Sequence, residues 1–230
     1  HVGDGDIAVA QAAVTALGQI GGEEACSAIQ TVRPNATANL KSALDDAALR
    51  CAECYLKTGQ IDTAVALYRE FSSSDKPGHL RAAALSGLIH AQPEEAADLV
   101  VKALAGTDLE AAKAAAGFLR DAARLPGEAI TRAAAALLPK AESERQILII
   151  ESLADRGDAA AGREVANVAV TAEPAVQEAA VKALGFLGDA SAVSLLLDVA
   201  AGKEGPSRVA RTALVSLPGD DVNQTLMNAA

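Results

Sequence analysis

Two cysteines three residues apart, Cys51 and Cys54, are the residues of this sequence whose type and spacing could carry chemistry. A C-x-x-C pair can ligate zinc, attach haem or cycle between dithiol and disulfide. A zinc site needs four ligands, and the chain holds neither a second C-x-x-C nor a closely spaced pair of histidines. Haem attachment requires histidine directly after the second cysteine, where Tyr55 stands. Zinc and haem are therefore disfavoured.

The redox alternative depends on the element that carries the two cysteines. Redox-active pairs lie at a helix N-terminus, where the helix dipole stabilises the thiolate. Here we expect Cys51 and Cys54 in the interior of a helix that ends near Gly59. Free cysteine behaves as a small buried apolar residue. We therefore expect these two cysteines, and Cys26 as well, to be free thiols in a helical core, and a metal or redox protein is the least favoured interpretation.

No other motif in the sequence points to catalysis. The three histidines, His1, His79 and His90, do not stand beside acidic residues at metal-ligand spacing. A Gly-rich phosphate loop and a nucleophile elbow are both missing. We expect no enzymatic activity, no bound metal and no cofactor.

Composition narrows the class of protein further. Half of the 230 residues are hydrophobic but only 2% are aromatic, and alanine supplies much of the apolar content, which is typical of an all-α chain. The net charge of −10 disfavours nucleic-acid binding, which needs clustered Lys and Arg. No apolar run approaches the roughly 20 residues that span a bilayer. We expect a soluble protein without membrane insertion, and three free thiols slightly favour the cytoplasm.

A repeat runs through the whole sequence. The segment AVTALGQIGG at 13–22 returns as AVKALGFLGD at 180–189. One large residue anchors each copy, small residues stand one and four positions before it, and Gly or Pro follows four positions after it in most copies. The anchors are Leu17, Tyr55, Leu88, Phe118, Leu153, Leu184 and Leu214. Each copy predicts two amphipathic helices joined by a turn.

Helical hairpins of this length cannot bury an apolar face alone, so neighbours must stack into a solenoid. We predict an all-α fold, a right-handed α/α superhelix of about seven stacked hairpins, forming a single domain over 1–230 that is a fragment of a longer chain. The predicted repeat units are approximately 1–32, 40–71, 77–105, 108–138, 142–171, 174–202 and 206–230.

The repeated residues resemble the HEAT-like repeat family, in particular the short bacterial, phycobilisome-lyase-like type with ALGxLGD at the first turn. The resemblance is strongest at 13–25 and 180–192. The unit at about 47–71 is similar to a tetratricopeptide repeat, with Tyr55, Gly59, Ala64 and Tyr68 at that family's spacing. The resemblance implies an armadillo-like solenoid that receives a partner on its concave face.

The first helix of each hairpin offers a candidate binding stripe. Positions two before and two after the anchor are i, i+4 neighbours that face away from the packed side. From these positions we predict partner binding at Lys57, His90, Arg120, Glu151, Asp155, Lys182 and Phe186. The favoured function is a non-catalytic protein-interaction or scaffolding module, monomeric or within a larger polypeptide, with a protein or peptide partner. The alternative is a lyase-type or cofactor-handling accessory protein that holds a small ligand in the groove.

Overall fold

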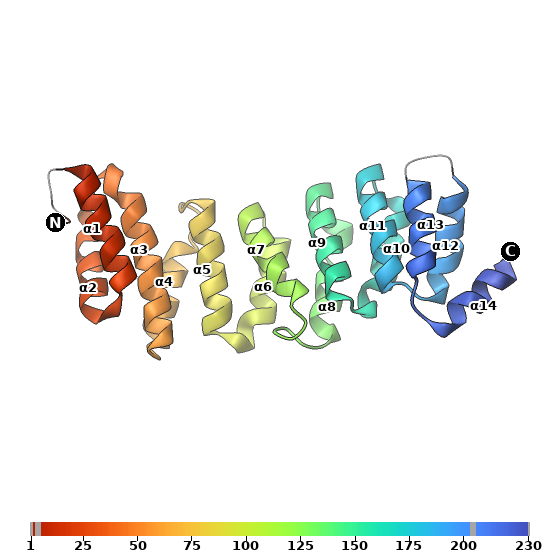
Figure 1. Ribbon diagram of the computed structural model, residues 1–230, viewed down its shortest axis with the longest axis horizontal. Coiled ribbons are helices and arrows are strands. Elements are labelled where there is room, and N and C mark those ends of the chain that lie inside the picture. Colours follow the sequence, from red (N-terminus) through yellow and green to blue (C-terminus); the bar gives the residue numbers. More distant parts are fainter. Residues whose placement is uncertain (1, 3–5, 203–205, 230) are drawn as a thin grey trace. The chain divides into compact units, whose positions relative to one another are not determined.

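The computed structural model describes residues 2, 6–202 and 206–229, and within them it contains fourteen α-helices and no strand (Figure 1). The all-α class and the helical-repeat architecture predicted from the sequence are confirmed. Residues 1 and 3–5 of the first predicted repeat unit and residue 230 of the last lie outside the described residues. The chain divides into two compact units, His1–Ala96 and Ala97–Ala230, and each is described by itself.

The first unit is built around its longest helix, α3. Its helices are α1 (Ile7–Ile20), α2 (Gly22–Val32), α3 (Ala38–Lys57), α4 (Ile61–Phe71) and α5 (Gly78–Ala91), with short 3-10 turns at Arg33–Asn35 and Pro93–Glu95. Helix α3 packs against all four of the other helices of the unit. The helices come close because small residues face each other: a Cβ on Gly18 of α1 would lie 3.1 Å from the Cβ of Ala47 on α3. The glycine directly after the anchor therefore has a packing role.

A buried ion pair holds the turn after α2 against α3 and α4. The Arg33 guanidinium lies 3.4 Å from the carboxylate of Asp45, which is buried on α3. The same guanidinium pairs with Glu70 on α4 and stacks 4.8 Å from the centre of the Phe71 ring. Arg33 thus ties three segments of the first unit together, and its charge compensates the buried carboxylate of Asp45.

The cysteines differ from the prediction of three free thiols. Cys26 on α2 and Cys51 on α3 form a disulfide with a Cα–Cα distance of 5.4 Å, and only Cys54 is free among the described residues. Both bonded cysteines are fully buried. The prediction failed because α2 and α3 pack side by side and bring together two residues 25 positions apart, a contact that the C-x-x-C spacing does not reveal. The argument for a cytoplasmic protein from three free thiols therefore loses its basis.

Cys54 has a role of its own at the start of α2. Its sulfur accepts a hydrogen bond from the backbone N–H of Gly22 at 3.3 Å. Gly22 is the first residue of α2, and no side chain caps this helix N-terminus from within the turn. The Cys54 sulfur thus satisfies one of the amide groups that a helix N-terminus leaves without a partner.

A close contact between α4 and α5 gives a first prediction. Gly87 on α5 faces the buried ring of Tyr68 on α4, and a Cβ at Gly87 would overlap that ring. Burial, with a smaller effect from the negative charge of Glu53, raises the pKa of Tyr68 to about 12, so the phenol stays protonated. We expect Gly87→Ala to lower the free energy of unfolding by about 1–3 kcal/mol, because the ring must leave its packed position.

Urea denaturation of Gly87→Ala measures this loss, and the same substitution at a second glycine serves as the control. Gly117 also lies inside a helix, and nothing stands within 4 Å of a Cβ placed there. Gly117→Ala should raise stability by up to about 1 kcal/mol through helix propensity alone. If both variants were stabilised, the tight contact between Gly87 and Tyr68 would not exist.

The second unit repeats one helical hairpin several times. Its helices are α6 (Ala96–Ala105), which begins at the boundary, α7 (Leu109–Arg120), α8 (Glu128–Ala135), α9 (Ser143–Arg156), α10 (Gly162–Thr171), α11 (Pro174–Leu187), α12 (Val193–Ala201), α13 (Pro206–Ser216) and α14 (Asp220–Ala229). The first helices of successive hairpins, α7, α9, α11 and α13, lie side by side as one layer (Figure 1). Helices α8, α10 and α12 each pack against the first helix of the following hairpin.

Two equivalent hydrogen bonds fix the hairpins of this unit to each other. Gln146 on α9 donates to the carbonyl oxygen of Leu138 at 2.8 Å, and Gln177 on α11 donates to that of Ala169 at 3.0 Å. In each case the side-chain amide of a glutamine near the start of a first helix donates to a backbone carbonyl near the end of the preceding hairpin. The repeat is thus a repeat of specific polar contacts as well as of apolar spacing.

The predicted register is wrong by one residue in α7. The sequence pattern made Phe118 the packed anchor, but Leu119 is fully buried and Phe118 is only half-buried. Ala115 and Ala116 are buried with Leu119, so the face of α7 that packs is rotated by one position from the predicted one. Ala116, expected on the exposed stripe, is therefore part of the core.

Candidate functional site

A hollow of about 230 Å³ lies on the exposed side of α7, α9 and α11 in the second unit. The residues that line it are Arg120, Glu151, Ala154, Asp155, Ala179, Lys182, Ala183 and Phe186. The lining combines three alanines, one aromatic ring and four charged groups. Phe186 is 56% exposed, an unusual state for a phenylalanine, and the short side chains of the alanines leave space near its ring.

Two of the four charges in the hollow compensate each other. Arg120, the last residue of α7, lies 3.1 Å from the carboxylate of Asp155 on α9. The side chains of Glu151 and Lys182 form no ion pair or hydrogen bond within the described part of the chain, and both are exposed. The hollow therefore offers one negative and one positive group that are free to contact another molecule.

The ends of α9 and α11 set the positions of these side chains. Helix α9 stops at Gly157, whose φ of 71° lies in the left-handed region that glycine adopts most readily. At the other end of α9, Ser143 donates a 2.8 Å hydrogen bond to Glu173, which directly precedes α11. This bond links the starts of α9 and α11, which pack side by side and carry Glu151 and Lys182.

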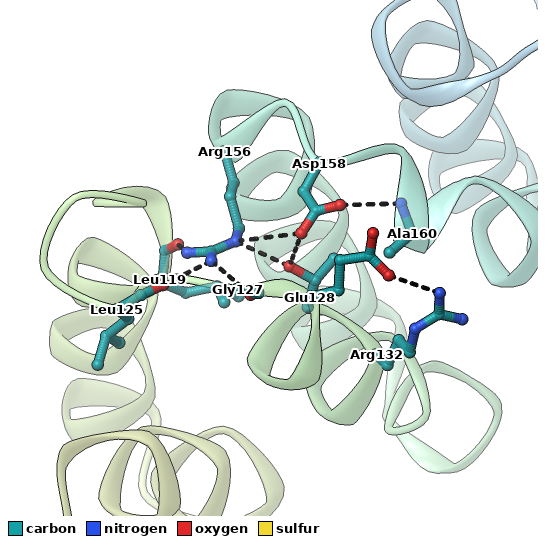
Figure 2. Close-up of polar contacts among 9 residues, drawn as sticks. Leu119, Leu125, Gly127, Glu128, Arg132, Arg156, Asp158 and Ala160 are labelled. Carbon is teal, nitrogen blue, oxygen red and sulfur yellow. Dashed lines mark hydrogen bonds and ion pairs between the residues drawn. The ribbon is translucent and has the colours of Figure 1, made fainter. Parts of the chain in front are cut away.

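The residue that follows Asp155 and ends α9, Arg156, is buried, and its polar contacts are drawn in Figure 2. The Arg156 side chain is only 2% exposed, and its guanidinium donates to the backbone oxygens of Leu119 at 3.0 Å, Leu125 at 2.5 Å and Gly127 at 3.0 Å. Its Nε donates to the Thr131 hydroxyl at 2.8 Å. Arg156 thus fixes the end of α7 and the following loop against α9 and α8, and in doing so it fixes the backbone next to Arg120.

Asp158 supplies the negative charge for this arginine. Its carboxylate accepts hydrogen bonds from the Thr131 hydroxyl at 2.6 Å and from the backbone N–H of Ala160 at 3.0 Å, and lies 3.9 Å from Arg156 Nε. Burial acts to raise the pKa of Asp158, but these hydrogen bonds and the charges of Arg156 and Arg132 outweigh it and lower that pKa. Asp158 is therefore ionised at neutral pH, and the buried guanidinium is compensated.

The structure places the seven sequence-predicted binding residues in two groups. Arg120, Glu151, Asp155, Lys182 and Phe186 line the hollow of the second unit. Arg120 lies there although its repeat was assigned the wrong register, because it ends α7 beside Asp155.

The other two predicted residues belong to the first unit. Lys57 ends α3 and is exposed. His90, near the end of α5, is exposed, and its ring nitrogen Nδ1 lies 2.6 Å from the backbone oxygen of Ser86 in the same helix. The hollow at Phe186 is therefore the candidate site, and binding at Lys57 and His90 stays a prediction.

A larger hollow of the same unit is a weaker candidate. It measures about 460 Å³ and lies at the turns of successive hairpins, with Arg132, Arg163 and Glu164 among its lining residues. Both arginines already have partners, since Arg132 pairs with Glu128 at 2.7 Å and Arg163 with Glu164 at 2.8 Å. This hollow therefore lacks the exposed ring and the two unpaired charges that distinguish the one at Phe186.

Within the described residues, no group of three or more His, Cys, Asp and Glu side chains is arranged to hold a metal ion. None of the described helices combines the length and the apolar content that crossing a bilayer requires.

Arg156 and its partners were not singled out in the sequence, but a signal was present. Arg156 stands three residues after its repeat's anchor, where four of the other six copies carry an apolar residue (Ile20, Ala91, Leu187 and Leu217) and two carry Thr58 and Asp121.

The stacked hairpins of both units define a helical-repeat protein. The model of the PBS lyase HEAT-like repeat matches residues 9–46, and the model of HEAT repeats matches residues 130–218. Both matches are to HEAT-like repeats, and they identify repeats of this kind in each of the two units. No curated protein matches the chain.

Proposed function

We propose that the chain is a non-catalytic interaction module that binds a protein partner through the hollow at Phe186. The observation that carries this proposal is an exposed aromatic ring beside three alanines, bordered by two unpaired charges on neighbouring helices. Aromatic side chains in partly enclosed positions supply much of the binding energy of protein interfaces. Solenoids of stacked repeats commonly use their helix layers as binding surfaces.

The size of the hollow favours a protein partner over a small ligand. Sites for small molecules typically enclose about 300–1,000 Å³ and bury most of the ligand. At about 230 Å³, the hollow at Phe186 fits one side chain of a partner better than a whole cofactor. The match of residues 9–46 to the PBS lyase HEAT-like repeat supports the second candidate, a cofactor-handling accessory protein. That match covers residues of the first unit, whereas the hollow is lined by residues of the second.

The disulfide supports a proposal about the compartment. Disulfides persist in oxidising compartments and are rare in the cytosol, where thiols are kept reduced. The pairing of Cys26 with Cys51 in the core of the first unit therefore favours an oxidising compartment as the place where the protein acts.

The proposed function is tested by replacing Phe186. The immobilised wild-type chain is expected to retain a partner protein from an extract of the source cells. The Phe186→Ala variant should retain at least about tenfold less of that partner, which corresponds to a loss of about 1.4 kcal/mol of binding free energy. The measurement is quantitative mass spectrometry of the retained proteins. Since Phe186 is exposed, the substitution should not change the melting temperature.

The matched control is Val215→Ala. Val215 is an apolar residue of the same unit, 88% exposed on α13, and it does not line the hollow. Retention of the partner by this variant should equal that of the wild type. Equal retention by Phe186→Ala and the wild type would exclude the hollow as the binding site.

A further inference from the structure

The chemistry of the partner follows from the order of groups across α9 and α11. Glu151 lies on α9 and Lys182 on α11, and each stands one helical turn before a second lining residue, Asp155 on α9 and Phe186 on α11. Because α9 and α11 pack side by side, a segment that crosses them meets a negative group on one helix and a positive group on the next.

The apolar part of the hollow lies between these two helices. Ala154 comes from α9, and Ala179 and Ala183 come from α11. Larger side chains at these positions would fill the space that the alanines leave near Phe186. An apolar side chain placed there would cover the exposed ring and remove apolar surface from water, a gain that grows with the area covered.

The other two charges do not compete for the partner. The 3.1 Å contact between Arg120 and Asp155 compensates both groups, and Arg156 bonds to the backbone oxygen of Leu119, the residue before Arg120. Within the described residues only Glu151 and Lys182 of the lining charges have no partner. Recognition by charge at this hollow therefore depends on these two groups.

We propose that the hollow binds a linear protein segment in which an apolar side chain stands between a basic and an acidic residue. The basic residue pairs with Glu151 on α9, the apolar side chain packs on Phe186, and the acidic residue pairs with Lys182 on α11. This proposal rests on the proposed function and adds the charge order of the partner to it. Opposite charges at an interface fix the register of binding and reject partners with the reverse order.

The test is a selection of phage-displayed random short peptides on the immobilised full chain, with peptides that also bind Phe186→Ala removed. The enriched peptides should carry an apolar residue flanked by a basic residue on one side and an acidic residue on the other. The double variant Glu151→Lys/Lys182→Glu reverses the charges of the hollow. Its affinity for these peptides should be at least about tenfold lower than that of the wild type. It should prefer peptides of the same sequence in which the basic and the acidic residue are exchanged.

The control exchanges the charges of an exposed ion pair elsewhere in the unit. Glu128→Arg/Arg132→Glu reverses the pair on α8, 2.7 Å apart in the wild type, which does not contribute to the lining. This variant should keep the peptide preference of the wild type. Measuring the melting temperatures of both double variants separates a loss of binding from a loss of folding.

The outcomes distinguish this proposal from the proposed function. Peptides that require Phe186 but bind the charge-reversed variant as well as the wild type would overturn the charge order and leave the proposed function intact. A failure to enrich such peptides, with partner proteins still retained through Phe186, would overturn a linear segment as the occupant. Self-association that depends on Phe186 would make a second copy of the chain the occupant and would also overturn the proposal.

Discussion

Replacing Arg156 by methionine is expected to lower the free energy of unfolding by about 3–5 kcal/mol, the cost typical of removing one partner from a buried charged network. Methionine fills much of the same volume but donates no hydrogen bond. The backbone oxygens of Leu119, Leu125 and Gly127 lose their donor, and each unsatisfied buried group costs about 1–3 kcal/mol. Asp158 loses the positive charge that lies 3.9 Å from its carboxylate.

Denaturation by urea, followed by circular dichroism, measures this loss. Arg132→Met is the matched control, because Arg132 lies in the same unit but is 65% exposed and makes one surface ion pair with Glu128. Surface pairs contribute about 0–1 kcal/mol, so this variant should stay close to the wild type. Arg156→Lys, which keeps the charge but cannot donate in several directions at once, should fall between the two.

Hydrogen exchange adds a local test of the same network. The loop between α7 and α8 forms its own hydrogen bonds around Asp121, whose side chain accepts from the amides of Ala123 and Arg124 and whose backbone oxygen accepts from those of Arg124 and Leu125. In Arg156→Met we expect faster exchange of the loop amides and of the last turn of α7. A variant that unfolds like the wild type and keeps loop protection would show that Arg156 does not anchor this segment.

The sequence was sufficient for the architecture because the repeat is local. Anchors such as Leu153 and Leu184 are fully buried as predicted, since helix periodicity alone puts them on the packed side. The pairs Glu151/Asp155 and Lys182/Phe186 lie where the i, i+4 rule placed them for the same reason.

The sequence failed where several faces of a helix are equally apolar. In α7 the run AAKAAAGFL at 111–119 offers small residues on most sides, so that Phe118 and Leu119 both fit as the anchor. Packing against α9 selects Leu119, and this choice depends on contacts that the sequence of α7 does not contain.

The Arg156 network and the disulfide were missed for a related reason. Both join residues more than 20 positions apart: Arg156 bonds to the Leu119 backbone, and Cys26 bonds to Cys51. The stacking of neighbouring hairpins creates these contacts. The expectation of three free thiols did not consider that three cysteines can also form a single pair and leave one thiol free.

Reducing the Cys26–Cys51 disulfide is expected to destabilise the first unit by about 3 kcal/mol. The bond closes a loop in which the two cysteines are 25 residues apart. A cross-link that closes a loop of this length lowers the conformational entropy of the unfolded chain, which stabilises the folded state by about that amount. In thermal unfolding followed by circular dichroism, a reductant should lower the melting temperature of the wild type. Cys26→Ala/Cys51→Ala should already melt lower than the oxidised wild type, and the reductant should not change it further.

The single free thiol provides two further tests, a control variant at Cys54 and a count of the reactive thiols. Cys54→Ser keeps an acceptor for the Gly22 amide and leaves the disulfide intact, so its melting temperature should still respond to the reductant like that of the wild type. Titration of the denatured, unreduced wild-type protein with a thiol reagent should find one reactive group, and three after reduction. Three reactive thiols before reduction, in protein purified from an oxidising compartment, would contradict the disulfide and the compartment inferred from it.

Because both bonded cysteines are fully buried, the bond in the folded protein should react with reductant mainly when α2 separates from α3. Its reduction rate should then follow the local opening of the first unit.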